Sequence, residues 1–382
     1  MIKLVDLTYY AHLNYTHASQ VTENHSPALA FAPYLISKID FSFVKHTAFE
    51  EHVVMDGVPY HFFKGSNRFW SVTLKTHQYI KKLKPDIVLV QGFIFPLQVI
   101  FLRLFCGKGF KIMIQHHGGL PFNGVKGWLQ KLACSFADAF IFTAAGNAGI
   151  WKRKNIIRQD APIFELLEAS THFKQQDKQI SKARTQMTGE TNLLWVGRLN
   201  ANKDPITVLL GFMQYLKIKP TARLYMIYQS DDMINEVMAL FASNKLLANA
   251  VILVGRVANH ELPYWYSAAD FYVSGSHKEG SGYALLEAMA CGCIPLITEI
   301  PPYQKITGSG QCGFLYPPGD ANALARLLYT VNNADKKKLS DDTLIYFHQN
   351  LTFKNIADDL VNICWQIMAK STNIAPIQAK DA

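Results

Sequence analysis

The fold is decided by the stretch Val273-Ser-Gly-Ser-His-Lys-Glu279-Gly-Ser-Gly282-Tyr-Ala-Leu-Leu-Glu287-Ala-Met-Ala-Cys-Gly292-Cys-Ile-Pro295. An apolar strand is predicted to end near Val273. Gly280 and Gly282 disfavour an earlier helix start, so the helix is predicted to begin at Tyr283 and to stop at Gly292. A second apolar strand follows at 294–298. This order of strand, loop, helix and strand predicts parallel sheets built from βαβ units.

The same alternation extends along the chain. A length of 382 residues, with 49% apolar and 18% charged residues, predicts a globular protein of two domains. Phe69 to Leu83 has the apolar spacing of a helix, which Pro85 ends. The remaining predicted strands are 2–7, 87–90, 111–115, 139–142, 193–196, 223–228, 251–254 and 271–273.

A polar stretch at 175–191 is interpreted as the interdomain linker. The predicted domains are 1–174 and 190–350, and an amphipathic helix at about 354–370 is expected to pack back on the first domain. The tail after Ser371 is predicted to be disordered. The expected architecture is two Rossmann-like, doubly wound parallel-sheet domains facing each other across a crevice, with any site in the loops that follow the strands.

Two carboxylates flank the predicted helix start at Tyr283. Glu279 lies in the loop and Glu287 in the second helical turn, so both can accept hydrogen bonds from hydroxyl groups of one ligand. The backbone amides of residues 281–284 lie at the positive end of the helix, where anions bind. A phosphate site beside a hydroxyl site suits a nucleotide-sugar. The alternative is a surface glutamate beside a tight glycine turn.

A second candidate loop follows the strand in Leu193-Leu-Trp-Val-Gly197-Arg198-Leu-Asn-Ala-Asn-Lys203-Asp-Pro205. Arg198 and Lys203 can close on a pyrophosphate, the arginine through its planar fork and the lysine as a point charge. An ordinary basic loop is the alternative. In the first half, His116 and His117 stand where a strand leaves the sheet, and only one of them is expected to face the crevice. No His or Cys spacing nearby predicts a zinc site.

Glu-x7-Glu followed by Ala-Met-Ala-x-Gly-x-x-Pro resembles the signature of family 4 retaining glycosyltransferases, which have the GT-B fold. The resemblance implies that Glu279 contacts the donor sugar and Glu287 the nucleotide ribose. It also implies that Arg198 and Lys203 stabilise the leaving diphosphate. His117 is favoured as the histidine that contacts donor or acceptor, with His116 as the alternative. The implied donor-binding residues are Gly197, Val257, Gly280, Ser281, Gly282, Tyr283, Ala284 and Glu287.

The chain departs from the family pattern at several places. Ser281 stands where Phe is more common, and Asp204 follows Lys203 where Gly is usual. Residues 227–229 replace a Gly-x-Gly, and 164–173 replace a Pro-Asn-Gly turn. Within that last segment Glu168 and Ser170 are interpreted as surface-loop residues, with a position in the crevice as the alternative. The expected N-terminal loop at 8–12 lacks the family's glycine pair.

The implied reaction moves a hexose-type sugar, with retention of configuration, from a nucleoside-diphosphate sugar to a saccharide or lipid-linked acceptor in cell-surface glycan synthesis. No cofactor and no metal are expected, because no Asp-x-Asp-like motif stands out. The alternatives are a nucleotide-sugar-binding protein without transferase activity and a phosphorylase or epimerase of the same fold. The resemblance leaves open whether the donor nucleotide is UDP, GDP or ADP.

Charge is unevenly distributed. The formal net charge is +9, of which residues 1–170 contribute +7 from 18 Lys and Arg against 11 Asp and Glu. A basic first half can attract an anionic acceptor or an anionic membrane surface, and a solvated basic face without a partner is the alternative. No nucleic-acid partner is expected.

Compartment signals are few. The start of the chain lacks the pattern of a signal peptide. The six scattered cysteines show no disulfide or metal spacing, so a reducing cytoplasm is expected. The apolar segment 87–105 imitates a membrane span, but its polar residues and proline favour a buried strand followed by an apolar helix.

Overall fold

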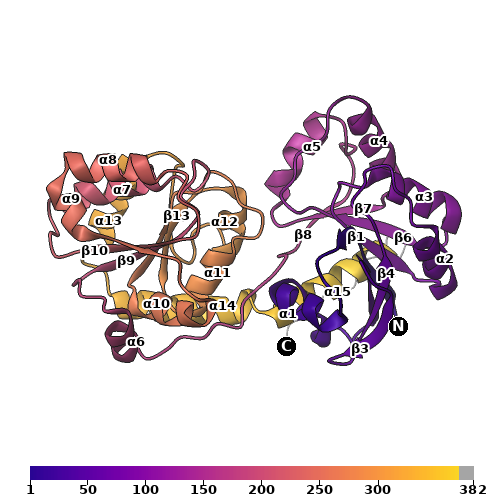
Figure 1. Cartoon of the computed structure of the whole chain (residues 1–382), viewed down its shortest axis with the longest axis horizontal. Coiled ribbons are helices and arrows are strands. Elements are labelled where there is room, and N and C mark those ends of the chain that lie inside the picture. Colours follow the sequence, from indigo (N-terminus) through magenta and orange to yellow (C-terminus); the bar gives the residue numbers. More distant parts are fainter. Residues whose placement is uncertain (370–382) are drawn as a thin grey trace. The chain divides into compact units, whose positions relative to one another are not determined.

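The computed structural model describes residues 1–369, with side chains omitted at 24–27. The chain divides into two compact units (Figure 1). Unit 1 comprises Met1–Ala169 and the helix α15 (Phe353–Ala369), and unit 2 comprises Ser170–Thr352. The tail after Ser371, for which disorder was predicted, lies outside the described residues.

Unit 1 is built on one eight-stranded sheet within residues 3–165, in the order β3-β4-β2-β1-β5-β6-β7-β8. Only the β3–β4 pair is antiparallel among the described strand pairs of this sheet. The strands are β1 (Lys3–His12), β2 (Asp40–Thr47), β3 (Glu51–Met55), β4 (Val58–Lys64), β5 (Ile87–Gln91), β6 (Lys111–Gln115), β7 (Ala139–Phe142) and β8 (Ile163–Glu165).

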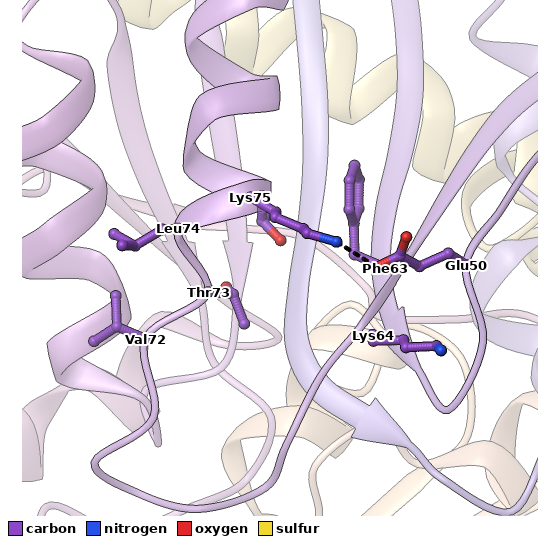
Figure 2. Close-up of a pocket in the computed structure, with 8 residues that line it drawn as sticks. Glu50, Phe63, Lys64, Val72, Thr73, Leu74 and Lys75 are labelled. Carbon is purple, nitrogen blue, oxygen red and sulfur yellow. Dashed lines mark hydrogen bonds and ion pairs between the residues drawn. The ribbon is translucent and has the colours of Figure 1, made fainter.

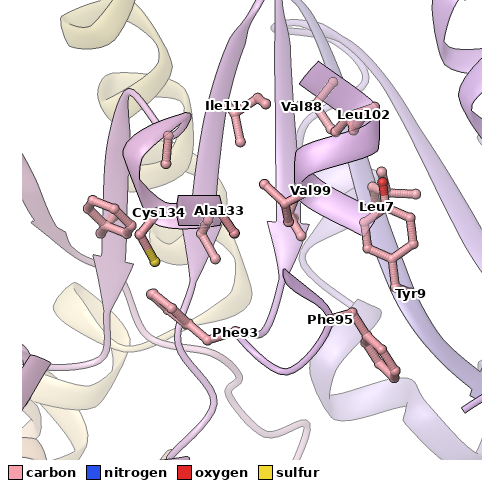
Figure 3. Packing of buried hydrophobic residues seen from close by; sticks show 14 of the residues in the cluster. Leu7, Tyr9, Val88, Phe93, Phe95, Val99, Leu102, Ile112, Ala133 and Cys134 are labelled. Carbon is pink, nitrogen blue, oxygen red and sulfur yellow. The ribbon is translucent and has the colours of Figure 1, made fainter. Parts of the chain in front are cut away.

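Helices connect these strands. The helices α2 (Leu74–Leu83), α3 (Pro96–Cys106) and α4 (Gly124–Ser135) pack side by side in that order (Figure 1). The core between sheet and helices is apolar and aromatic, with Val88 and Ile112 from the strands meeting Val99 and Leu102 of α3 (Figure 3). The other helical segments are α1 (Ala18–Leu29), η1 (Ala32–Tyr34), which contacts α15, η2 (Ala145–Ala148) and α5 (Gly149–Arg153).

Unit 2 contains a six-stranded, fully parallel sheet in the order β11-β10-β9-β12-β13-β14. Its strands are β9 (Asn192–Gly197), β10 (Arg223–Tyr228), β11 (Val251–Gly255), β12 (Phe271–Ser274), β13 (Ile294–Thr298) and β14 (Phe314–Tyr316). Its helices are α6 (Lys178–Thr185), α7 (Pro205–Tyr215), α8 (Ile234–Ser243), α9 (Lys245–Ala250), η3 (Asn259–Glu261), α10 (Leu262–Ala268), α11 (Tyr283–Ala290), α12 (Pro301–Ile306), α13 (Ala321–Val331) and α14 (Lys336–Asn350).

The predicted parallel α/β class is confirmed, and the predicted strands of both halves occur in the structure. Three predictions were wrong in detail. Residues 8–12 are not a loop, because β1 continues to His12 past an irregularity in its pairing with β2 between Thr8 and Ala11. The helix predicted from Phe69 begins only at Leu74. The segment interpreted as a linker contains the helix α6, which Asp177 caps and which packs against α10.

The apolar segment 87–105 is the strand β5 followed by the helix α3, as predicted. Across residues 1–369, no helix is both long enough and apolar enough to cross a membrane.

Candidate active site

The strand order of unit 2 reverses direction between β9 and β12. From β9 the chain proceeds outward through β10 to β11, whereas from β12 it proceeds outward through β13 to β14. In an open parallel sheet, ligands bind beyond the carboxyl ends of the strands at such a switch point. The loops that leave β9 and β12, at 198–204 and 275–282, are the loops for which the sequence predicts site residues.

These two loops are tied together by their backbones. The amide of His277 donates to the carbonyl of Asn202 at 2.8 Å, and the side-chain amide of Asn202 donates to the carbonyl of Lys278 at 3.0 Å. The approach is so close at Gly275 that a Cβ there would lie 2.6 Å from the carbonyl oxygen of Asp204. Any larger residue at 275 would therefore push the loops apart.

Asp204 organises the junction between its loop and the helix α7. Its backbone is left-handed, with φ of 41°, which explains why glycine serves well at this position. The carboxylate caps α7 by accepting from the amide of Thr207 at 3.0 Å, and it also contacts Nε2 of His277 at 2.9 Å. Asp204 thereby holds both loops, a role that the sequence analysis missed.

The hydrogen bonds between these two loops bring Lys203 and Glu279 into direct contact. The ammonium of Lys203 donates to Oε1 of Glu279, and both side chains are largely buried, with 22% and 12% of their surface exposed. The hydroxyl of Tyr303, on α12, donates to the same oxygen at 3.1 Å and lies 3.0 Å from Oγ of Ser274. Burial raises the pKa of Tyr303 far above its usual value, so this group remains a hydroxyl donor.

The helix α11 begins where the sequence predicted. Gly282 caps it in a left-handed conformation, with φ of 65°, and a Cβ there would lie 2.8 Å from Cδ1 of Ile306. Glu287 lies in the second turn, and one carboxylate oxygen accepts a hydrogen bond from the hydroxyl of Tyr266 at 3.0 Å. Burial raises the pKa of Glu287 to about 7, although the Tyr266 hydroxyl favours the ionised form.

Arg198 follows directly on β9 and is exposed to solvent. Within residues 1–369 its guanidinium makes no hydrogen bond or ion pair, so it is available to an incoming anion. Val257 lies in the loop after the edge strand β11, which is separated from β9 in the sheet by β10. The remaining predicted donor-binding residues flank Arg198 or the start of α11, and they are Gly197, Gly280, Ser281, Tyr283 and Ala284.

His117 belongs to unit 1 and lies just after β6. Its Nε2 is 2.7 Å from Oε1 of Gln91, and its Nδ1 is 3.3 Å from Oε2 of Glu168. The side-chain amide of Gln91 donates to the carboxylate of Asp6 at 2.6 Å, which orients Oε1 toward the imidazole. Two side-chain oxygens, one from Gln91 and one from Glu168, thus face the two ring nitrogens of His117.

The surface-loop interpretation of Glu168 and Ser170 was wrong. The Glu168 side chain is only 10% exposed, because it turns inward to His117 and accepts from the hydroxyl of Thr143 at 3.2 Å. Ser170 is buried and donates to the carbonyl of Leu351. A single glutamate in an apolar context carries no spacing pattern that would reveal such a contact.

His116 makes different contacts from His117. It is buried, its Nε2 lies 2.9 Å from the carbonyl of Gly119, and its ring stacks on Phe142. Burial lowers its pKa, so the ring is neutral. Among the described residues, no group of three or more His, Cys, Asp or Glu side chains could hold a metal ion.

A cavity of about 300 Å³ lies elsewhere in unit 1, where α2 begins beside the ends of β2 and β4 (Figure 2). Thr73 and Thr76 line it together with Lys64, and Lys75 forms an ion pair with Glu50 at its edge, with 3.4 Å between Nζ and Oε1. None of the predicted site residues lines this cavity.

Part of the chain resembles known proteins in sequence. Residues 176–342 match the family model for glycosyl transferases group 1. The alpha-monoglucosyldiacylglycerol synthase of Streptococcus pneumoniae is 32% identical over 129 residues, which are 34% of this chain and 29% of that protein. The GDP-mannose:cellobiosyl-diphosphopolyprenol alpha-mannosyltransferase of Xanthomonas oryzae pv. oryzae is 31% identical over 120 residues, 31% of this chain and 32% of that protein. The chain thus spans about a third of the length of these curated relatives.

Solved structures resemble the whole chain. The sucrose-phosphate synthase of Thermosynechococcus elongatus superposes with a TM-score of 0.66 at 16% identity, covering 96% of this chain and 100% of that one. Anabaena HepE in complex with UDP superposes with a TM-score of 0.67 at 15% identity, covering 98% and 100%. At such identities the likeness shows the fold alone. The chain therefore has the GT-B fold, and its residues 176–342 are similar to the model for glycosyl transferases group 1.

Proposed function

We propose that the protein is a retaining, metal-independent glycosyltransferase that moves a hexose from a nucleoside-diphosphate sugar to a saccharide or lipid-linked acceptor in cell-surface glycan synthesis. The proposal is carried by one observation, the contact between Lys203 and Glu279 at the switch point of the unit 2 sheet. A cation and a carboxylate held together there, beside the start of α11, can separate to bind the two halves of a diphosphate-sugar.

In this proposal the ligand-free contact is a resting arrangement. The donor diphosphate attracts the ammonium of Lys203 away from Glu279. The carboxylate is then free to accept hydrogen bonds from sugar hydroxyls, while Tyr303 keeps it in place. Because the two side chains neutralise each other when no donor is present, neither is left as an isolated, largely buried charge.

The diphosphate is stabilised by charge and by oriented amides. Arg198 is exposed and unpaired within the described residues, and its planar fork suits a phosphate. The first amides of α11 lie at the positive end of the helix. Both act on the negative charge that grows as the leaving group departs, which is where electrostatic catalysis is most effective. Glu287 would accept from the ribose hydroxyls.

No protein base is required for the acceptor in this mechanism. The acceptor hydroxyl attacks on the face from which the diphosphate departs. A phosphate oxygen then takes its proton, and the configuration at the anomeric carbon is retained. His117 is proposed to contact donor or acceptor from unit 1, held by Gln91 and Glu168.

The proposed hexose and lipid-linked acceptor are supported by the substrates that appear in the names of two relatives. One is a monoglucosyldiacylglycerol synthase and another a mannosyltransferase that acts on a diphosphopolyprenol-linked saccharide. HepE structures contain UDP with glucose, or UDP-glucose. These substrates belong to those proteins, and for this chain they define the first panel to be tested.

The test is a panel of UDP-, GDP- and ADP-hexoses, first by thermal shift and then by transfer to saccharide and polyprenyl-diphosphate acceptors in the presence of EDTA. We expect the hexoses of one nucleotide to raise the melting temperature and to support turnover. The product should have the same anomeric configuration as the donor sugar, which NMR coupling constants at the anomeric centre measure. Donor binding without hydrolysis or transfer would identify a nucleotide-sugar-binding protein instead. An inverted product, or activity abolished by EDTA, would overturn the corresponding part of the proposal.

A further inference from the structure

The positive charge of the protein is concentrated in a single segment. Residues 65–131 contain ten Lys and Arg but one acidic residue, Asp86, and so carry a net charge of +9. The other residues carry 28 Lys and Arg and 28 Asp and Glu, so their charges cancel. The whole formal charge of the chain therefore resides in the segment that forms α2, α3 and α4 of unit 1.

The same segment exposes large apolar side chains. On α3, Phe101, Leu104 and Phe105 are 40%, 67% and 37% exposed, and their spacing places them on one face of the helix. On α4, Val125 and Trp128 are 70% and 62% exposed and lie three residues apart. The helices α3 and α4 pack against each other (Figure 1), so these exposed apolar residues lie on neighbouring helices of unit 1.

Lysines are interleaved with these apolar residues. The ammonium of Lys81 on α2 lies 5.2 Å from the centre of the Phe105 ring, and that of Lys126 on α4 lies 5.0 Å from the ring of Phe69. In the part of the chain that the structure describes, several exposed lysines of the segment make no ion pair, namely Lys81, Lys82, Lys84, Lys108, Lys126 and Lys131. Their charges are not compensated by the protein itself.

We propose that the α2–α3–α4 face docks on the surface of an anionic lipid bilayer. The exposed apolar residues of α3 and α4 would enter the boundary between headgroups and acyl chains, while the lysines reach the phosphates along their aliphatic stems. Each lysine near such a surface adds attraction, and the segment has no acidic side chain other than Asp86 to oppose it. A nucleic acid would match the charge but would offer no apolar layer to the side chains of Leu104 and Phe105.

This inference does not depend on the donor site. Docking would bring unit 1 to the surface where a lipid-linked acceptor resides, but the surface itself is defined by α2, α3 and α4 alone. The two proposals can therefore fail separately, because vesicle binding and donor turnover are read by different assays.

The test is flotation of the whole chain with vesicles of neutral phosphatidylcholine or of phosphatidylcholine mixed with phosphatidylglycerol. We expect binding to the anionic vesicles at low salt, little binding to neutral ones, and weakening as salt shortens the screening length. Addition of anionic vesicles should also shift the fluorescence of Trp128 to shorter wavelength, which Trp128→Phe would remove in part. Equal binding to both kinds of vesicle, or binding to neither, would overturn the proposal.

Two sets of variants separate the contribution of the lysine charges to vesicle binding from that of the apolar side chains. The triple change Lys81→Ala, Lys82→Ala and Lys84→Ala should lower the partition coefficient about a hundredfold. Leu104→Ser with Phe105→Ser should abolish the apolar insertion and lower partition about tenfold or more. Both sets should leave donor hydrolysis in solution unchanged, since none of these residues belongs to the donor site.

The matched control lies on α14 of unit 2, where Lys337, Lys338 and Ile345 are also exposed. Replacing these two lysines by alanine and the isoleucine by serine removes two positive charges and one exposed apolar side chain outside unit 1, and we expect wild-type vesicle binding. Circular dichroism and melting temperature establish that each variant folds. If the α14 variant loses as much binding as the α2 and α3 variants, the attraction is a property of net charge and the docking face is refuted.

Discussion

Lys203 and Glu279 are 76 residues apart in the chain, and in unit 2 the ammonium of one donates to the carboxylate of the other. The contact exists because the loops after β9 and β12 are bonded along their backbones and because Gly275 allows them to approach. Lys203, predicted to bind the diphosphate, and Glu279, predicted to bind the sugar, are thus joined by a direct hydrogen bond.

Lys203→Ala and Glu279→Gln should each lower kcat/KM roughly tenfold or more without unfolding the protein. Because the two side chains form one unit, their effects on the stability of the ligand-free protein should not add, and a double-mutant cycle of thermal unfolding measures this coupling. Lys217→Ala removes an exposed lysine of the same unit and serves as the control. Near-normal turnover in both site variants would refute the site assignment.

Tyr303→Phe should reduce turnover without abolishing it. The variant removes the hydroxyl that holds Glu279, whereas the carboxylate keeps Lys203 and Ser274 keeps its contact with Ser276. Loss of one hydrogen bond of this kind corresponds to about 1 kcal/mol, so we expect a fall of roughly twofold to tenfold in kcat/KM. Steady-state kinetics with the identified donor measure it. An effect as large as that of Glu279→Gln would mean that Tyr303 contacts the substrate itself.

Asp204→Gly tests whether the side chain or the backbone matters at the start of α7. Glycine adopts the left-handed conformation easily, so the variant loses only the carboxylate's contacts, which are the cap, the hydrogen bond from the Thr207 hydroxyl and the contact with His277. We expect a loss of about 1 kcal/mol in unfolding free energy, by chemical denaturation, and a weaker donor affinity. Asp204→Ala should destabilise the protein further, because alanine also strains the backbone there. Equal stability of the glycine and alanine variants would contradict this account.

Glu287 should make donor binding depend on pH. Its pKa is raised to about 7 by burial, so the carboxylate that would accept two ribose hydroxyls forms only as the pH rises through that value. The KM for the donor is therefore expected to fall between about pH 6 and pH 8. In Glu287→Gln the KM should be higher and should lose this dependence.

The same pKa shift has the opposite effect on stability. The ordinary pKa is 4.5, so the folded protein binds this proton more tightly than the unfolded chain does. Relative to Glu287→Gln, the wild type should lose stability as the pH rises from about 5 through 7, which thermal unfolding at several pH values measures. A wild type that gains stability over this range relative to the variant would show that the carboxylate is compensated in the fold.

The strands of unit 2 could be predicted because their apolar runs are continuous, as buried parallel strands require. The start of α11 was predicted for a local reason, since its glycines and helix formers are adjacent in sequence. The helix α6 was missed because its exposed surface is polar. The strands β3 and β4 were missed although Asp56-Gly57, the dipeptide between them, is a hairpin-turn signal.

Site residues could be predicted only where they belong to a short motif of residues that are close in sequence. Arg198, Lys203, Glu279 and Glu287 were found in short motifs, but their partner Tyr303 lies on a helix that no motif connects to them. Asp204 could have been found, because an aspartate before a proline is a helix-start signal. Glu168 could not, since its contact with His117 depends on how β6 and β8 are placed in the sheet.

The helix α15 returns to unit 1 after the whole of unit 2 has been formed, so unit 1 is made from two separate segments and unit 2 from one. The continuous unit, Ser170–Thr352, can in principle be exchanged between chains by a single insertion with two junctions. Recombination at these junctions would replace unit 2 and leave the α2–α3–α4 face of unit 1 intact. Under the two proposals made above, such a layout would let donor preference and membrane docking evolve independently.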